Sequence, residues 1–272
     1  MKKSDILTPL GLILAFGFVI LGICLGKSGL KPFIDGASVA ITCGGSFAAV
    51  LITFSMDDLK TGFKATKETL RSGNVNKVDL VDQFKELARK VRKDGPLAVE
   101  QEVSQIEDDF LRKGLELAID GIDMEDIKEI LEIEIGEVEN NYSKGAKIYK
   151  VWGGYAPAFG MVGTLIGLIQ MLADMGTPDT IAKGMGAALI TTFYGALMAN
   201  ALLNPLGYNI QIKGEKECEK MDMMICGIMS IQNGDSTRVI EEKLVNFLTP
   251  KEKKAYYKRE TLEGGPAHAA YR

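Results

Sequence analysis

Four apolar stretches, each long enough to cross a membrane, constrain this chain more than any other feature of its 272 residues. A membrane-spanning helix needs about 20 consecutive apolar residues, because each residue advances the helix axis by only about 1.5 Å. None of the four stretches carries a charged residue in its interior, and Asp35 lies only near the start of the second. They cover residues 6–25, 33–54, 151–173 and 184–206. The sequence therefore predicts an all-α membrane protein with four transmembrane helices.

Lysine and arginine residues predict the orientation of these helices, because both accumulate in short loops on the cytoplasmic side of a membrane. Basic residues follow the second stretch, precede the third and follow the fourth. In the two short connecting loops, the only basic residues are Lys27, Lys31 and Lys183. We therefore expect both termini and the large middle region to lie in the cytoplasm, with the two short loops on the outside.

These considerations divide the chain into five parts. We expect transmembrane helices one and two over residues 1–54, a helical cytoplasmic domain over 55–150, transmembrane helices three and four over 151–206, a cytoplasmic C-terminal helix over 207–248, and a flexible tail over 249–272. The tail is expected to be flexible because it is dense in charge and contains Gly264-Gly265-Pro266.

Inside the middle region, apolar residues at three- and four-residue spacing indicate helices. Gly95-Pro96 is expected to end the first of them. A second helix is expected from Leu97 to Leu117, and a third from about Met124 after the Asp120-Gly121 turn signal.

Several classes of chemistry are excluded by composition. The only histidine, His268, lies in the tail, so neither a Ser-His-Asp set nor a histidine-based metal site is expected. The four cysteines lack a zinc-binding spacing. An acidic block between basic flanks does not indicate a nucleic-acid partner. We expect no catalytic residue, no metal and no cofactor, and hence a protein that is not an enzyme.

The apolar stretches also limit how the chain conducts ions. Ion passage through a membrane usually uses an intramembrane carboxylate or another ionisable group. The four stretches supply no such group in their interiors. If the chain takes part in ion conduction, a partner must supply the carboxylate.

The prolines and the threonines in stretches three and four each allow two interpretations of their role. Pro157 and Pro205 are either ordinary membrane-helix prolines or hinges at a similar depth, since proline removes a helix hydrogen bond. Thr164 and Thr192 either bond to their own helix carbonyls or belong to a polar seam that faces a partner or a water-filled path. If the short loop pairs the two stretches as a hairpin, these threonines lie near each other.

A charge cluster surrounds the Gly95-Pro96 turn. It contains Arg92 before the turn and Glu100 after it. Such a cluster is either a solvated surface or a protein-docking patch, because charges orient partners and speed their encounter.

The segment Ala-Pro-Ala-Phe-Gly-Met-Val-Gly-Thr at 156–164, with Thr-Thr-Phe-Tyr-Gly at 191–195 and Asn-Pro-Leu at 204–206, resembles the MotA/PomA family of flagellar motor stator subunits. This resemblance covers nearly the whole chain up to about residue 250. It implies a subunit of the bacterial inner membrane that surrounds two copies of a MotB-type subunit as a pentamer. The partner then brings the membrane aspartate, and cation flow drives torque on the rotor protein FliG.

The resemblance also assigns roles to individual residues. Arg92 and Glu100 match rotor-contacting charges, and Pro157 and Pro205 match the two functional prolines. Thr192 matches a threonine that faces the partner aspartate. Thr164 matches a position where sodium-driven members have a similar residue and many proton-driven members have alanine, which leaves proton and sodium open as the coupling ion.

Two alternatives stand beside this reading. An ExbB/TolQ-type ion-driven energiser has a similar architecture but three spans in a different order. A self-sufficient solute transporter usually shows intramembrane charges or broken, pseudo-symmetric helices, and neither is evident in this sequence.

Overall fold

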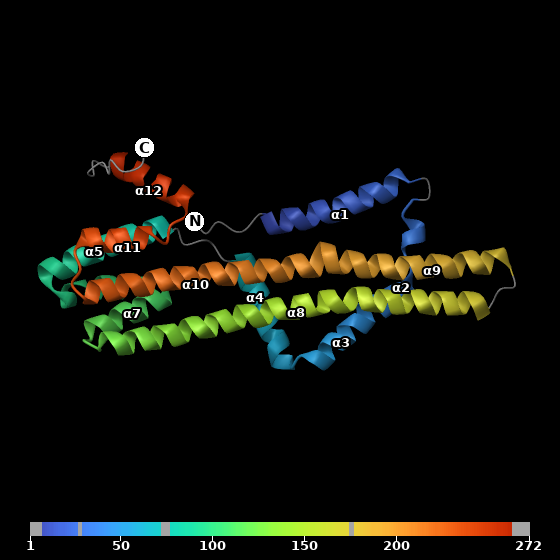
Figure 1. Ribbon diagram of the computed structural model, residues 1–272, viewed down its shortest axis with the longest axis horizontal. Helices are drawn as coiled ribbons and strands as arrows, with labels where there is room; N and C mark the ends of the chain where they lie inside the picture. Colours follow the sequence, from blue (N-terminus) through green and yellow to red (C-terminus); the bar gives the residue numbers. More distant parts are fainter. Residues whose placement is uncertain (1–6, 27–28, 72–76, 174–176, 263–272) are drawn as a thin grey trace. The chain divides into compact units, whose positions relative to one another are not determined.

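The computed structural model describes residues 7–26, 29–71, 77–173 and 177–262, and over these ranges the regular secondary structure is helical, without strands (Figure 1). The chain forms two compact units. The first contains residues 1–73 and 140–214, and the second contains residues 74–139 and 215–272. Two long helices, α8 (Met124–Ala173) and α10 (Asn204–Gln232), contribute residues to both units.

Within the described ranges, four helical segments are long and apolar enough to span a membrane: Leu7–Leu25, Lys31–Thr53, Met124–Ala173 and Pro178–Gln232. This confirms the predicted all-α fold with four candidate membrane helices. The third and fourth segments extend well beyond the apolar stretches of the sequence, because each spanning helix continues without a break into a charged helical part.

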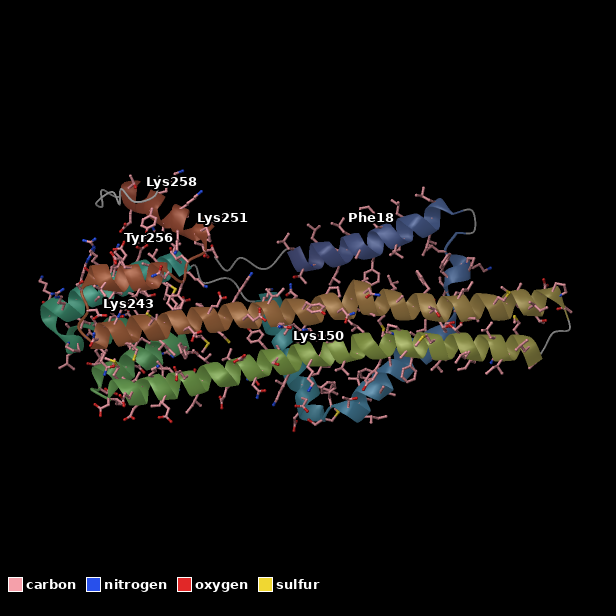
Figure 2. The ribbon with its side chains drawn as sticks, viewed as in Figure 1. Phe18, Lys150, Lys243, Lys251, Tyr256 and Lys258 are labelled. Carbon is pink, nitrogen blue, oxygen red and sulfur yellow. The ribbon has the colours of Figure 1, made fainter. Side chains whose placement is uncertain are left out.

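The first span is α1 (Leu7–Leu25), and it has no buried residue. Most of its large apolar side chains, Phe18 among them, are exposed (Figure 2). Apolar side chains exposed over a whole helix suit contact with lipid or with another membrane helix rather than with water.

The second span is built from three consecutive helical segments, α2 (Gly36–Val39), the π-helical η2 (Ala40–Gly44) and α3 (Gly45–Thr53), after a short 3-10 turn η1 (Lys31–Phe33). Asp35 caps α2, since its carboxylate accepts a hydrogen bond from the Ser38 backbone N–H at 2.7 Å. Three small polar side chains at four-residue spacing, Ser38, Thr42 and Ser46, are buried on one face of this span.

The third and fourth spans pack against each other through glycines (Figure 1). The fourth span consists of α9 (Pro178–Leu197), the π-helical η4 (Met198–Leu203) and the start of α10. A Cβ atom placed on Gly195 would lie 2.7 Å from the Ala156 carbonyl oxygen, and one on Gly167 would lie 3.0 Å from the Ala188 backbone nitrogen. The backbones of α8 and α9 therefore approach as closely as small residues allow.

The second span and the helix that follows it also pack on α8. The indole N–H of Trp152 donates a hydrogen bond to the Ser46 hydroxyl at 3.0 Å. The hydroxyl groups of Thr66, on α4 (Met56–Arg71), and Tyr149 are 3.0 Å apart. These contacts fix the second span and α4 along α8 in the first unit.

The second unit is a helical bundle built from the N-terminal part of α8, the C-terminal part of α10 and six further helical segments. These segments are α5 (Lys77–Asp94), the 3-10 turn η3 (Pro96–Val99), α6 (Glu100–Val103), α7 (Asp109–Ile119), α11 (Thr237–Val245) and α12 (Pro250–Leu262). As predicted, α5 ends before Gly95, which has a φ of 88° that favours glycine.

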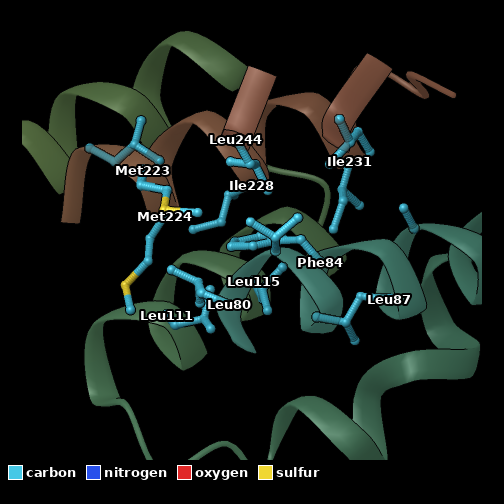
Figure 3. Packing of buried hydrophobic residues seen from close by; sticks show 14 of the residues in the cluster. Leu80, Phe84, Leu87, Leu111, Leu115, Met223, Met224, Ile228, Ile231 and Leu244 are labelled. Atoms are coloured by element: carbon cyan, nitrogen blue, oxygen red, sulfur yellow. The ribbon is translucent and has the colours of Figure 1, made fainter. Parts of the chain in front are cut away.

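Phe84 lies at the centre of this bundle, among Leu115, Ile228 and other apolar side chains (Figure 3). It is fully buried, and the ring occupies the space beside Gly227. A Cβ atom on Gly227 would lie only 2.5 Å from the ring. The glycine in α10 thus makes room for the largest apolar side chain of α5.

Two predictions about the helical parts were wrong. The helix expected from Leu97 to Leu117 is divided, because Asp108 leaves the helical conformation and caps α7 by accepting from the Leu111 N–H. The helix expected over 207–248 ends at Gln232, since Gly234 has a φ of 72° and terminates α10. Ser236 then caps the separate helix α11.

The expected flexible tail is instead helical over Pro250–Leu262, and residues 263–272 lie outside the described residues. Thr249 and Glu252 cap this helix reciprocally, since the Glu252 carboxylate accepts from the Thr249 N–H at 2.8 Å. Tyr256 of α12 is buried in the core of the second unit. Burial of this aromatic side chain contributes to the docking of α12 on the second unit.

Candidate functional site

Thr164 and Thr192 are brought together by the pairing of α8 with α9, as the hairpin argument predicted. Their hydroxyl oxygens are 2.5 Å apart. The Thr164 hydroxyl also lies 3.1 Å from the Gly160 carbonyl oxygen and 3.0 Å from the Ala188 carbonyl oxygen. Two hydroxyls share one hydrogen bond here, so at least one oxygen keeps a lone pair for a further donor or a cation.

This hydroxyl pair lies on an otherwise apolar surface of the first unit. Thr192 is exposed and Thr164 is half-buried. The neighbouring exposed side chains on α8 and α9 are large and apolar, with Met161, Leu165 and Leu189 each more than half exposed. A small polar group in an apolar membrane face suits a partner helix that places its own polar group against the hydroxyls.

Other polar residues of the two spans bond mainly within the chain. Thr191 is buried, and its hydroxyl donates to carbonyl oxygens of its own helix, at 2.9 Å from Ala188. The Asn200 amide donates to the Ala196 carbonyl oxygen at 3.0 Å. Among the threonine hydroxyls of the predicted polar seam, the exposed one is that of Thr192, which is hydrogen-bonded to Thr164.

Pro157 lies inside α8, which continues through it without interruption. Its backbone packs closely on α9, since a Cβ atom placed on Gly195 would lie 3.0 Å from the α-carbon of Pro157. Because proline has no N–H, the carbonyl one turn earlier loses its helix partner at this position.

Pro205 is the second residue of α10, which directly follows the π-helical segment η4. A π-helical turn changes the hydrogen-bond pattern of a helix and is often found at functional sites. Its neighbours Asn204 and Gly207 contact α8 at Gly153 and Ala146. Pro205 therefore lies about one to two helical turns along α8 from Pro157, so the two prolines are not on one level as the sequence suggested.

Arg92 and Glu100 lie on opposite sides of the Gly95 turn in the second unit, in the last turn of α5 and the first turn of α6. Both side chains are exposed, and neither has an ion-pair partner among the described residues. A bridge between their neighbours spans the turn, since Lys90 Nζ lies 2.7 Å from a Glu102 carboxylate oxygen. The hydrogen bond to Glu102 raises the pKa of Lys90 above its usual value, so the Lys90 ammonium stays protonated at neutral pH.

One polar cluster of the second unit was missed by the sequence analysis. Lys85 of α5 is buried, and its ammonium lies 2.8 Å from the Tyr256 hydroxyl, 3.2 Å from Glu241 and 2.5 Å from Glu260. Lys85 falls on the same helical face as Val78, Val81 and Ala88, which was the signal available in the sequence. A lysine at such a position requires a buried carboxylate partner.

The pKa values of this cluster follow from its burial and contacts. Burial raises the pKa of the Tyr256 hydroxyl, and its hydrogen bond to Glu241 raises it further, so the phenol stays protonated. Burial alone would raise the pKa of Glu260, but the hydrogen bond from Lys85 lowers it overall. The cluster is therefore a hydrogen-bonded link between α5, α11 and α12.

The fold and these sites define a class of protein: a helical membrane subunit with four candidate spans, a second helical unit and no carboxylate inside its apolar spans. Residues 102–223 match the MotA/TolQ/ExbB proton channel family. An uncharacterized protein, YtxD, of Bacillus subtilis is 37% identical over 272 residues, which cover 99% of this chain and 100% of the relative.

One further relative and one solved structure have names that state a role. Motility protein A of Borreliella burgdorferi is 36% identical over 238 residues, which cover 88% of this chain and 92% of the relative. The structure of the flagellar MotAB stator complex from Bacillus subtilis contains a chain with a TM-score of 0.86 and 29% identity, and the match covers 93% of this chain and 99% of that chain. The chain belongs to the MotA/PomA family of flagellar motor stator subunits.

Proposed function

We propose that this chain is the ring-forming stator subunit that, with a MotB-type partner, couples cation flow across the bacterial inner membrane to torque on the flagellar rotor. The observation that carries the proposal is the Thr164–Thr192 hydroxyl pair on an apolar face of spans that contain no internal carboxylate. Family membership and the structural match to a MotAB stator complex support the same role.

The assembly that we propose is a pentamer of this chain around two copies of the MotB-type subunit. Its apolar helices span the membrane with both termini and the second unit in the cytoplasm, as the distribution of lysine and arginine favours. The partner places a membrane aspartate beside the hydroxyl pair. Such a carboxylate binds and releases the cation, while the hydroxyls orient it or supply further oxygen ligands.

In this proposal the prolines transmit motion and the exposed charges make contact with the rotor. Pro157 and Pro205 act as hinges in the two long helices that enter both units. Arg92 and Glu100 contact the rotor protein FliG, which their exposure and lack of described ion-pair partners support. This role involves no covalent chemistry by the chain, so we propose that it is not an enzyme.

Ion flux through defined membranes tests the proposal. Proteoliposomes that contain only this chain are expected to be tight to protons and sodium, because a charge-free bundle offers a cation no compensation for its lost hydration. Proteoliposomes with both subunits are expected to conduct, and replacing the partner's membrane aspartate by asparagine should abolish the current. A clear cation current from this chain alone would contradict the proposal and favour a self-sufficient transporter.

An ExbB/TolQ-type energiser is the second candidate, since the matching family includes such proteins. The fourth spanning segment and the named motility relatives favour the flagellar role. Restoration of swimming in a strain that lacks its own stator genes distinguishes the two, because an energiser of another envelope process should not restore it.

A further inference from the structure

A cavity of about 380 Å³ lies in the second unit, where α5, α7 and α10 end. Its walls are mainly apolar and include Leu87, Val91, Val99, Leu115, Ile119 and Ile231. Protein interiors are normally packed to about the density of organic crystals. An opening of this size lined by apolar side chains is therefore an unfilled space that a partner group can occupy.

The cavity is kept open by the way its three helices end. Each of α5, α7 and α10 is followed by a glycine with positive φ: 88° at Gly95, 77° at Gly121 and 72° at Gly234. Two of these glycines, Gly121 and Gly234, line the cavity. Because they have no side chains and fix tight turns, the three chain reversals surround the space without filling it.

Positive charges lie beside the cavity. Arg92 lines it, and Arg89 and Lys93 are exposed in the same last turns of α5. None of the three has an ion-pair partner among the described residues. The carboxylate that lines the cavity, Asp235, is already bound to Lys243 at 2.7 Å. A partner surface with unpaired carboxylates would be electrostatically complementary to these positive charges at the cavity entrance.

We propose that the cavity receives one bulky apolar side chain, aromatic or branched, from a helix of the rotor protein whose neighbouring carboxylates face Arg89, Arg92 and Lys93. This inference rests on the proposed contact between the second unit and FliG. Exposed charges orient a partner and speed its encounter, but they contribute little to how long it stays bound. An apolar anchor in a preformed cavity supplies that lifetime, which a contact that transmits force requires.

Filling the cavity from within tests the inference. Ala118 lines it from α7, and Ala118→Leu should occupy part of the space, with Ala118→Val as a smaller variant where leucine lowers the unfolding temperature. Ala98→Leu is the matched control, because Ala98 is exposed on η3 and does not line the cavity. The measurements are thermal unfolding of the complex with the MotB-type partner, binding of that complex to purified FliG, and swimming speed.

We expect the filled variant to unfold at the same or a higher temperature, while its affinity for FliG falls about tenfold or more and swimming slows. The control should match the wild type in all three. Normal FliG binding and swimming by the filled variants would overturn the inference, as would an equal loss in the control. Swimming lost with FliG binding retained would also overturn it, since the cavity then serves another ligand.

Arg92→Glu separates this inference from the proposed function. If Arg92→Glu abolishes FliG binding and the filled variants do not, the cavity plays no part and the rotor contact stands. If neither change affects binding, the rotor contact itself is wrong.

Discussion

The hydroxyl oxygens of Thr164 and Thr192 are 2.5 Å apart, although 28 positions separate the two residues in the sequence. The contact joins α8 to α9 on an apolar face, close to two carbonyl oxygens of the same helices. Two hydroxyls and two carbonyls form a small group of oxygens in a membrane span. Oxygen ligands of this kind suit a hard cation such as sodium, whereas a proton needs only a carboxylate.

The coupling ion is tested by Thr164→Ala. If sodium drives the motor, loss of one oxygen should cost about 1–3 kcal/mol of ion binding and raise the sodium concentration for half-maximal swimming speed about tenfold or more. If protons drive it, the change should have little effect. Swimming speed measured against sodium concentration at fixed pH gives the answer, with Thr164→Ser as the control that keeps the hydroxyl.

The hinge role is tested by Pro157→Ala and Pro205→Ala. Alanine restores a backbone N–H and favours a straight helix, so the variants should assemble with the MotB-type partner but swim poorly. Pro178→Ala is the matched control, because Pro178 is in the first turn of α9, where no helix hydrogen bond is lost. Normal swimming of both hinge variants would reduce the prolines to packing features, and loss of assembly would make their role structural.

The close packing of α8 on α9 is tested by Gly195→Ala. The added Cβ would lie 2.7 Å from the Ala156 carbonyl oxygen, and a backbone atom cannot move away as a side-chain end can. We expect a loss of about 1–3 kcal/mol in stability, seen as a lower unfolding temperature of the complex in detergent. Gly186→Ala, where no atom lies within 4 Å of the new Cβ, should be neutral or stabilising.

The cluster around Lys85 is tested by Tyr256→Phe. The lost hydroxyl lies 2.8 Å from Lys85 and 2.7 Å from Glu241, and both partners remain buried or half-buried. Loss of these hydrogen bonds should lower the free energy of unfolding by about 1–3 kcal/mol and lower the unfolding temperature. Tyr208→Phe serves as the control, because Tyr208 is exposed and phenylalanine keeps the ring that lies 4.4 Å from the Lys150 ammonium.

The same cluster gives a pH dependence. Folding lowers the pKa of Glu260 from its ordinary value of 4.5. The ionised Glu260 carboxylate therefore stabilises the folded protein fully at pH values above 4.5. This stabilisation is lost as the pH falls below 4.5 and through the pKa that Glu260 has in the folded protein. We expect hydrogen exchange of α12 amides to increase under these acidic conditions, and Glu260→Gln to weaken this dependence. Equal acid sensitivity in the variant would exclude Glu260 as the titrating group.

Local sequence patterns predicted the spans and several helix ends correctly. The break at Gly95-Pro96 and the start of a helix near Met124 both appear in the structure, because turn glycines and apolar periodicity act over only a few residues. The helix expected to continue through Asn233-Gly234 to Leu248 was wrong, although the same turn signal was present there.

The tail was misread for a different reason. Residues 250–262 are dense in charge and read as solvated, but Tyr256 is buried and bonds to Lys85, 171 positions earlier. The burial of an aromatic residue in a charged segment has no local signature, since it depends on a site formed by distant helices.

The sequence by itself determined that this chain has four apolar spans, a largely helical remainder and no carboxylate inside those spans, because length, hydropathy and residue type are local properties. It also carried the motifs of the MotA/PomA family. The short loop between stretches three and four also predicted that Thr164 and Thr192 lie near each other. Only the tertiary structure decided the buried Lys85 cluster and the cavity beside Arg92, which depend on packing between helices far apart in the chain. Such contacts are set by the combined packing of whole helices, and no single segment specifies them.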